Sequence, residues 1–109
     1  MSSTPIQPSP EAPTFVGQLR NGGFNTPLYR LTIYPDRLVF RYRTEKVIPK
    51  HGVESVCLHR APVIGWVYPS GVRFWHQSPD FHPRLIFNTL RSRRLIRELE
   101  RLGYPVSPE

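Results

Sequence analysis

The sequence predicts a mainly β fold, a sandwich or partly open barrel of about seven strands capped by one C-terminal α-helix. Three observations support this prediction. Most of the chain alternates between apolar and polar residues, which is typical of half-buried strands. Turn-forming proline, glycine, asparagine and aspartate separate these short runs. Only the last segment changes to the period of a helix.

A single domain accounts for most of the chain, because 109 residues provide material for one core. Residues 1–13 contain four prolines and three serines, and Ile6 is their one large aliphatic side chain after the initiator. Such a segment cannot bury enough apolar surface to offset the entropy lost on ordering. We therefore expect a disordered tail over residues 1–13 and a folded domain over residues 14–106.

The first strands are predicted from alternation and turn residues. Residues 15–20 form the first predicted strand, and the Asn-Gly-Gly sequence at 21–23 ends it. Residues 29–34 and 37–43 alternate on either side of a Pro-Asp turn, which predicts a hairpin. The side chains of the second run that we expect to face the core are Leu38, Phe40 and Tyr42.

Four further strands are predicted over residues 46–48, 53–59, 72–76 and 84–88. Each is short, and a proline or glycine lies close to most of their ends. In the third of these runs Phe74 is expected to point inward, so its neighbour should point outward.

The final segment is predicted to be an amphipathic helix. Its apolar stripe consists of Leu95, Ile96, Leu99 and Leu102. Thr89 or Ser92 is expected to cap the start, and Gly103 to adopt the left-handed conformation after the end. Arg94 and Glu98 are spaced for an i,i+4 ion pair.

The order of these motifs resembles the pleckstrin-homology superfamily, and most of all its bacterial PH-like and GRAM-type domains. In those domains a hairpin of the form Leu-x-Leu-Thr-x-x-Arg-Leu-x-Phe precedes an Ile-Pro-x-x-x-Ile-Glu-Ser-Val strand. The helix then follows an Ile-x-Phe-x-Thr exit. The similar segments here are residues 29–40, 48–49, 54–56 and 86–89, and the resemblance covers residues 28–106.

The resemblance implies a non-catalytic interaction module. Lipid-binding members hold inositol phosphates with basic residues around the loop between their first two strands. The corresponding residues here, 21–27, contain no lysine or arginine, and only Arg20 and Arg30 lie at the ends. Many members of the superfamily bind proteins or oligomerise, so the resemblance favours a protein partner or self-association.

The composition indicates a basic protein of the cytoplasm. The net charge is +7, and the chain has 15 lysines and arginines. Such a surface attracts nucleic acid or anionic lipid, whereas the high arginine content could equally reflect the coding bias of the genome. No apolar run is long enough to span a bilayer, and the N-terminus does not resemble a secretory signal. The single cysteine, Cys57, suits a reducing compartment.

No catalytic residue, metal site or cofactor is predicted. The acidic residues are scattered and the sequence contains no phosphate-binding glycine loop or nucleophile elbow. The four histidines show no tight metal-ligand spacing. Cys57 and His59 are expected to share one face, where His76 from another strand could complete a metal site. Ordinary surface histidines are the favoured interpretation.

Trp75 is the first candidate binding residue. We expect it to point outward between Arg73 and His76, as an anchor for a protein partner. The alternative is that the loop over residues 79–83 covers it. Both interpretations remain open at this stage.

Arg91, Arg93 and Arg94 form the second candidate site. They lie near the predicted helix start, where positive charge opposes the helix dipole. An anionic partner such as a phosphate, a lipid headgroup or an acidic protein would favour this placement, but a solvated polar face is the alternative. We therefore expect protein binding or self-association through an open sheet edge and the Trp75 surface. The alternative function is peripheral binding to an anionic membrane or nucleic acid through these arginines.

Overall fold

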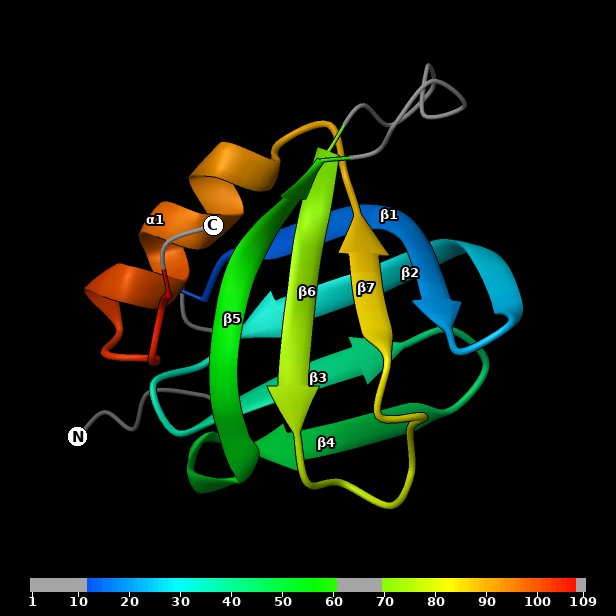
Figure 1. The fold of residues 1–109 in the computed structure, drawn as a ribbon, viewed down its shortest axis with the longest axis horizontal. Helices are drawn as coiled ribbons and strands as arrows, with labels where there is room; N and C mark the ends of the chain where they lie inside the picture. Colours follow the sequence, from blue (N-terminus) through cyan, green and yellow to red (C-terminus); the bar gives the residue numbers. More distant parts are fainter. Residues whose placement is uncertain (1–11, 61–69, 108–109) are drawn as a thin grey trace, which may run out of the picture.

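A seven-stranded antiparallel sheet and a single helix form the described part of the chain, residues 12–60 and 70–107 of the computed structural model (Figure 1). The strands are β1 (Thr14–Asn21), β2 (Phe24–Ile33), β3 (Arg37–Arg41), β4 (Glu45–Pro49), β5 (Val53–Arg60), β6 (Ser70–His76) and β7 (Leu85–Asn88). A 3-10 turn, Lys50–Gly52, links β4 to β5, and helix α1 (Ser92–Arg101) follows β7. The predicted mainly β fold of about seven strands with one C-terminal helix is confirmed.

The predicted tail, residues 1–13, falls mostly outside the described residues, which begin at Ala12. The backbone carbonyl of Pro13 accepts a hydrogen bond of 3.0 Å from the amide of Ile33. This bond lies next to the first residue pair of β1 and β2. Pro13 therefore extends the ladder between these two strands.

Strand β1 is shared by the two halves of the sheet. The strand order is β4-β3-β2-β1-β7-β6-β5, so β1 pairs with β2 along most of its length and with β7 over residues 18–21. Opposite the segment from Gly17 to Leu19, β2 contains one extra residue, and Leu28 has a φ of 65° there. A bulge of this kind increases the local twist and bends the strand. The sheet thus curls at β1 into a half-barrel (Figure 1).

Gly17 lies where β1 passes from one half of the sheet to the other. A Cβ atom at this position would clash with the backbone carbonyl of Asn88 and press on the ring of Phe87, both on β7. A residue with a side chain would therefore push β7 away from β1. The glycine is required by this close approach of two strands.

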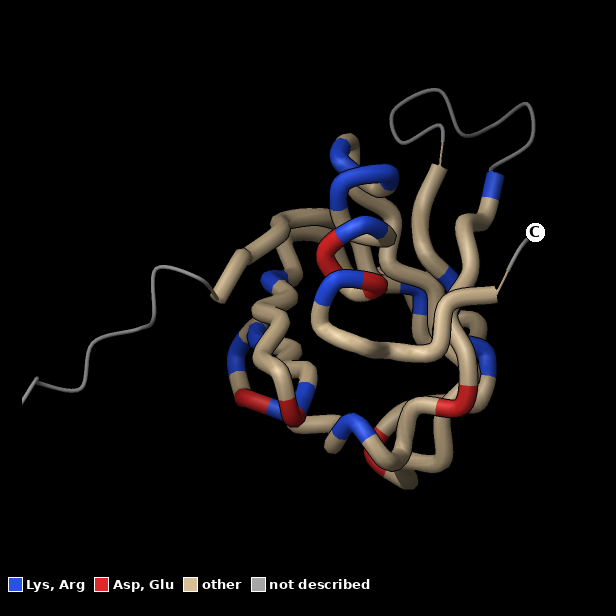
Figure 2. Tube along the Cα trace, turned by 90° about the vertical axis from the view of Figure 1, so that its left-hand side faces the viewer, with Lys and Arg blue, Asp and Glu red and all other residues tan. Residues whose placement is uncertain are grey.

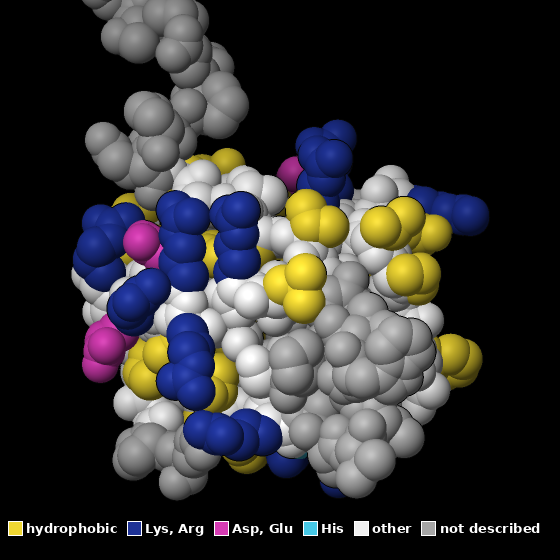
Figure 3. Space-filling model, turned by 90° about the horizontal axis from the view of Figure 1, so that it is seen from above, with side chains coloured by type: hydrophobic (Ala, Val, Ile, Leu, Met, Phe, Trp, Pro, Cys, Tyr) yellow, Lys and Arg dark blue, Asp and Glu magenta, His cyan; other side chains and the backbone are white. Residues whose placement is uncertain are grey.

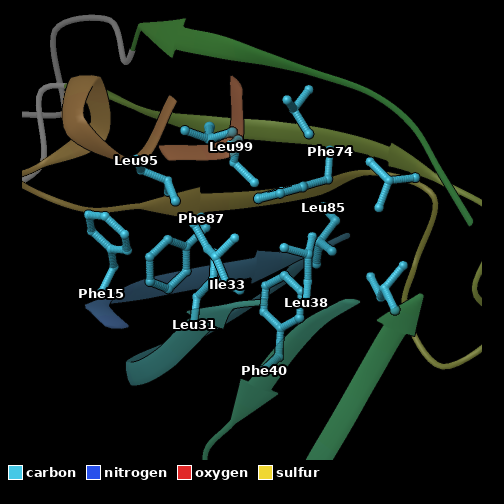
Figure 4. Close-up of a cluster of buried hydrophobic side chains, with 14 of the residues drawn as sticks. Phe15, Leu31, Ile33, Leu38, Phe40, Phe74, Leu85, Phe87, Leu95 and Leu99 are labelled. Carbon is cyan, nitrogen blue, oxygen red and sulfur yellow. The ribbon is translucent and has the colours of Figure 1, made fainter. Parts of the chain in front are cut away.

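The core fills the space between the two halves of the curled sheet. Figure 1 shows β5, β6 and β7 in front of β2, β3 and β4, and Figure 4 shows buried side chains between them. The ring of Phe40 on β3 lies 5.7 Å from Phe74 on β6 and 5.1 Å from Phe81, both edge to face. Each such pair contributes about 0.5–1.5 kcal/mol beyond the burial of its surface. Phe40 therefore joins the two halves through aromatic contacts.

Helix α1 closes one end of the half-barrel by packing against β5 and β6 (Figure 1). Leu95 and Leu99 are completely buried, and Ile96 and Leu102 are partly buried against the same core. The predicted apolar stripe is confirmed. Gly103 also takes the predicted left-handed conformation after the helix, with a φ of 85°.

The predicted helix caps are wrong. Arg91 occupies the N-cap position, and no side chain there caps the helix. Thr89 instead donates its hydroxyl to the carbonyl of Val16 at 3.0 Å, which ties the chain before the helix to β1. Ser92 is buried and hydrogen-bonded to Ser70 at the start of β6. Both hydroxyls therefore fix the helix to the sheet.

The predicted ion pair between Arg94 and Glu98 is also wrong. Glu98 accepts two hydrogen bonds from Arg101, from Nε at 3.0 Å and from Nη2 at 2.8 Å. Arg101 lies in the last turn, where positive charge interacts favourably with the helix dipole. Arg94 remains exposed.

The segment after the helix covers part of the outer edge of β5. The amide of Val56 donates to the carbonyl of Pro105 at 2.9 Å, and the amide of Ser107 donates to the carbonyl of Val56 at 2.8 Å. Tyr104 is buried and donates its hydroxyl to the carbonyl of Tyr34 at 2.6 Å. This edge is therefore partly occupied by the chain itself.

Two local predictions are wrong. The expected loop over residues 21–27 is a tight turn at Gly22 (φ 66°), because β2 already starts at Phe24. Tyr42 is 44% exposed instead of facing the core, since β3 ends one residue before it. Its ring stacks on Tyr29 at 5.6 Å.

Replacing Leu99 by alanine should lower the free energy of unfolding by about 2–5 kcal/mol, because it leaves a cavity beneath the helix. Equilibrium urea unfolding measures this loss. The matched control is Leu90→Ala, since Leu90 is 73% exposed and its removal creates no cavity. A loss below about 0.5 kcal/mol for Leu99→Ala would mean that burial of the stripe does not hold the helix in place.

Candidate interaction surface

The outer face of β5, β6, β7 and the end of β1 carries the first candidate surface. In Figure 1 this half of the sheet lies in front, with its outer face toward the viewer. Strand register places Cys57, Arg73, Ile86 and Arg20 side by side across the four strands. Two positions away along β6, Trp75 lies on the same face.

Arg84 belongs to this face as well. It directly precedes Leu85, which is completely buried and pairs with Phe74. Alternation therefore places Arg84 on the outer side, next to Trp75. The five residues Arg20, His59, Arg73, Trp75 and Arg84 are called the Trp75 face from here on.

Trp75 is partly exposed and is stacked with an arginine. It retains 37% of its surface, and the Cζ atom of Arg73 lies 4.3 Å from the centre of its ring. The loop that follows β6 turns away from it, because Phe81 is buried on the core side of the sheet. Of the two open interpretations, coverage by the loop over residues 79–83 is therefore not supported, and Trp75 remains partly exposed.

The structure does not bring His76 to this surface with Arg73 and Trp75. It is buried on the opposite face of β6, as alternation after an outward Trp75 requires. Its Nδ1 accepts the amide of Ser78 at 3.0 Å, and its Nε2 lies 2.9 Å from the carbonyl of His82. Both ring nitrogens thus hold the loop after β6. The conceivable site of Cys57, His59 and His76 is excluded by these opposite orientations.

Positive charge dominates the Trp75 face. Within residues 12–60 and 70–107, Arg20, Arg73 and Arg84 form no ion pair, whereas Asp36, Glu45 and Glu98 pair with arginines elsewhere. Desolvation lowers the pKa of His59, and the charges of Arg20, Arg73 and Arg84 lower it further. The positive charges of all three arginines therefore act on the imidazole of His59.

Among the described residues, one buried polar atom of Arg73 is unsatisfied. Its Nε is buried and has no hydrogen-bond partner among the described residues. Buried donors of this kind are costly unless a partner satisfies them. With its guanidinium stacked on Trp75, Arg73 presents a fixed fork of donors.

The arginines at the helix start form a second basic surface. Arg91, Arg93 and Arg94 are all exposed, as is Arg97 one turn later. Figure 2 shows blue segments along the helix, and Figure 3 shows basic side chains gathered over the side where α1 lies. The structure thus places the first three together on the solvent side of the helix start.

Two hollows border this second surface. Arg93 and Arg97 line one of about 270 Å³ together with Leu58 and Ile96, between α1 and β5. Arg91 lines another, of about 430 Å³. The other residues of that hollow are Thr14, Phe15, Val16, Thr89 and Leu90.

The described residues contain no cluster of three or more histidines, cysteines or acidic side chains that could hold a metal ion. In the same part of the chain, no helix is both long and apolar enough to cross a membrane.

Sequence reasoning did not place Arg20, His59 and Arg84 on one surface with Trp75. Alternation indicates that each points outward from its own strand, but the pairing of strands decides whether they meet. Arg20 reaches the face only because β1 pairs with β7. A pattern within one strand carries no signal for that pairing.

No protein-family model matches the chain, and no curated protein is significantly similar to it.

The pKa of His59 should lie below its ordinary value of 6.5, and replacing Arg84 by glutamine should raise it by removing one of the nearby charges. NMR titration of the imidazole measures both values, with Arg43→Gln, in the turn after β3, as control. Because folding lowers this pKa, the unfolded chain binds more protons, so His59 reduces stability as the pH falls through 6.5. His59→Gln should remove that part of the pH dependence. An unchanged pKa in Arg84→Gln would contradict the charge cluster.

Proposed function

We propose that this chain is a non-catalytic interaction module that binds a protein partner, or a second copy of itself, through the Trp75 face. The observation that carries the proposal is the stacked pair of Trp75 and Arg73, flanked by Arg20 and Arg84 with no acidic partners in the described residues. Tryptophan and arginine are the side chains most enriched at the energetic centres of protein interfaces.

The resemblance to bacterial PH-like and GRAM-type domains supports a module of this kind. The strand order, four strands and then three with a closing helix, is compatible with that resemblance. The tight turn at Gly22 and Gly23 leaves no basic loop between β1 and β2 for an inositol phosphate. The single cysteine suits a reducing compartment, and we propose that the module acts in the cytoplasm.

The sheet edges are less suitable than the face. The edge of β5 is partly occupied by residues 105–107 of the chain itself. The other edge, β4, has five residues, includes two charged side chains and ends in Pro49, features that protect an edge from pairing. The proposal therefore relies on side chains of the Trp75 face.

Photo-crosslinking tests this function. A benzophenone amino acid at position 75 should form a specific adduct with a protein partner or a second copy of the chain in lysate of the cells that express it. The same group at position 47 is the control, because the exposed fraction of Val47, 39%, is close to that of Trp75, but Val47 lies on the other half of the sheet. Equal adduct patterns at the two positions would show that the Trp75 face has no partner.

A second candidate function, peripheral binding to an anionic membrane, is favoured by the helix start. Arg91 lines a hollow with Val16 and Leu90, two strongly exposed apolar residues. Figure 3 shows exposed hydrophobic side chains beside the basic ones on the same side of the molecule. Apolar side chains flanked by arginines suit the interface of an anionic bilayer.

Replacing Arg91, Arg93 and Arg94 together by glutamine should weaken binding to vesicles of acidic lipid without lowering stability. Sedimentation of vesicles at two salt concentrations measures it, and a duplex-DNA shift assay separates lipid from nucleic acid. The matched control removes the same charge from the exposed residues Arg30, Arg41 and Arg43. If both variants bind vesicles equally, the helix start is not a membrane site.

A further inference from the structure

We propose that the partner of the Trp75 face is an acidic segment of a protein, with its carboxylates paired to Arg20, Arg73 and Arg84. This inference rests on the proposed function, because it names the chemistry of the partner that the face would bind.

The positive charge of the Trp75 face is the first argument for an acidic partner. The charges of three arginines act on it, and none of the three forms an ion pair with an acidic side chain of the described residues. Arginine donates through a planar fork, which matches the two oxygens of a carboxylate. The stacking of Arg73 on Trp75 fixes the orientation of that fork, so little side-chain entropy remains to be lost on binding.

The spacing of the arginines is the second argument for an acidic segment of a protein. Arg20 and Arg73 lie on strands separated by β7, with Ile86 between them in the register. Neighbouring strands are about 4.8 Å apart, so the two Cα atoms are about 10 Å apart. Carboxylate side chains several residues apart in one peptide can each pair with an arginine at this spacing. The buried Ile86 and the indole provide the apolar centre typical of protein interfaces.

Of the two occupants named above, an acidic segment suits this face better than a second copy of the chain. In a symmetric dimer the same patch contacts itself, so the arginines of one copy would face those of the other. Each copy also carries a net charge of +7, which opposes association.

Nucleic acid is the less favoured polyanion. Single strands bind by stacking bases on exposed aromatic rings. Among the described residues, Trp75 is the large aromatic side chain on this face, and Arg73 already covers one side of its ring. In the described part of the face, this half-covered ring therefore suits carboxylates of a protein better than stacked bases.

Binding should be coupled to the protonation of His59. The charged groups that act on it are Arg20 from β1, Arg73 from β6 and Arg84 before β7, and the titratable Cys57 lies on the same face of its own strand. Carboxylates bound to the arginines would offset their charge and raise the pKa of His59. Binding of an acidic segment should therefore be accompanied by proton uptake at His59. The affinity of the segment should increase as the pH falls from about 7.5 to about 6, which is still above the pKa of glutamate.

The test uses the full chain and a glutamate peptide of about ten residues as probe, with a glutamine peptide of the same length as control. NMR should show shifts at the indole N–H of Trp75 and a raised pKa of His59 with the glutamate peptide alone. Replacing Arg20 and Arg84 by glutamine should weaken binding at least tenfold. Both side chains are exposed, so this variant should fold. Replacing Arg30 and Arg43, which are also exposed, removes the same charge and should leave binding within about twofold.

Equal losses in the two double variants would overturn the proposal, because binding would then follow net charge alone. It would also be overturned if a thymidine oligonucleotide, inorganic phosphate or acidic vesicles shifted the Trp75 signal more strongly than the peptide at equal charge concentration. Should the peptide fail while position 75 still crosslinks to a protein, the acidic preference is wrong and the module function stands. If the peptide binds at Trp75 but position 75 forms no crosslink to a protein, the module function alone would be overturned.

Discussion

The close approach of β1 and β7 at Gly17 is the constraint on which the rest of the structure depends. The carbonyl of Asn88 occupies the space that a side chain at position 17 would need. The bulge opposite, with Leu28 in the left-handed region, lets β2 follow the bend of β1. This bend brings the two halves face to face, and their enclosed side chains become a core that α1 closes.

The same bend assembles the Trp75 face. Arg20 lies beyond the bend, in the part of β1 that pairs with β7, so it joins the outer side of the second half. Val16, before the bend, is on the outer side of the first half opposite Arg30. One strand thus contributes an arginine to one surface and an apolar residue to another. The two candidate surfaces differ in character because β1 changes partner between them.

Sequence reasoning succeeded where the structure is local. The hairpin around Pro35 and the stripe of Leu95 and Leu99 depend on neighbours in the chain, so their periodicity predicted them.

Sequence reasoning failed where contacts between distant segments of the chain determine the conformation. Pro27 suggested a loop, yet β2 continues through it because the bulge accommodates a residue there. His76 was expected at the surface beside Trp75, although its position in the alternation and its contacts with the following loop bury it. Arg20 and Arg84 are 64 positions apart in numbering, and their proximity follows from the pairing of β1 with β7.

The central position of β1 also has a consequence for the order of assembly. Its pairing with β2 is formed by neighbours in sequence, whereas its pairing with β7 joins residues 64 to 70 positions apart. During synthesis on the ribosome β1 therefore has a complete hairpin partner early and an unsatisfied edge until β7 has emerged. Contacts of such long range slow folding because a large loop must close first. The nascent chain thus passes through a stage in which the first four strands exist as an open sheet, the state in which chaperones would find it.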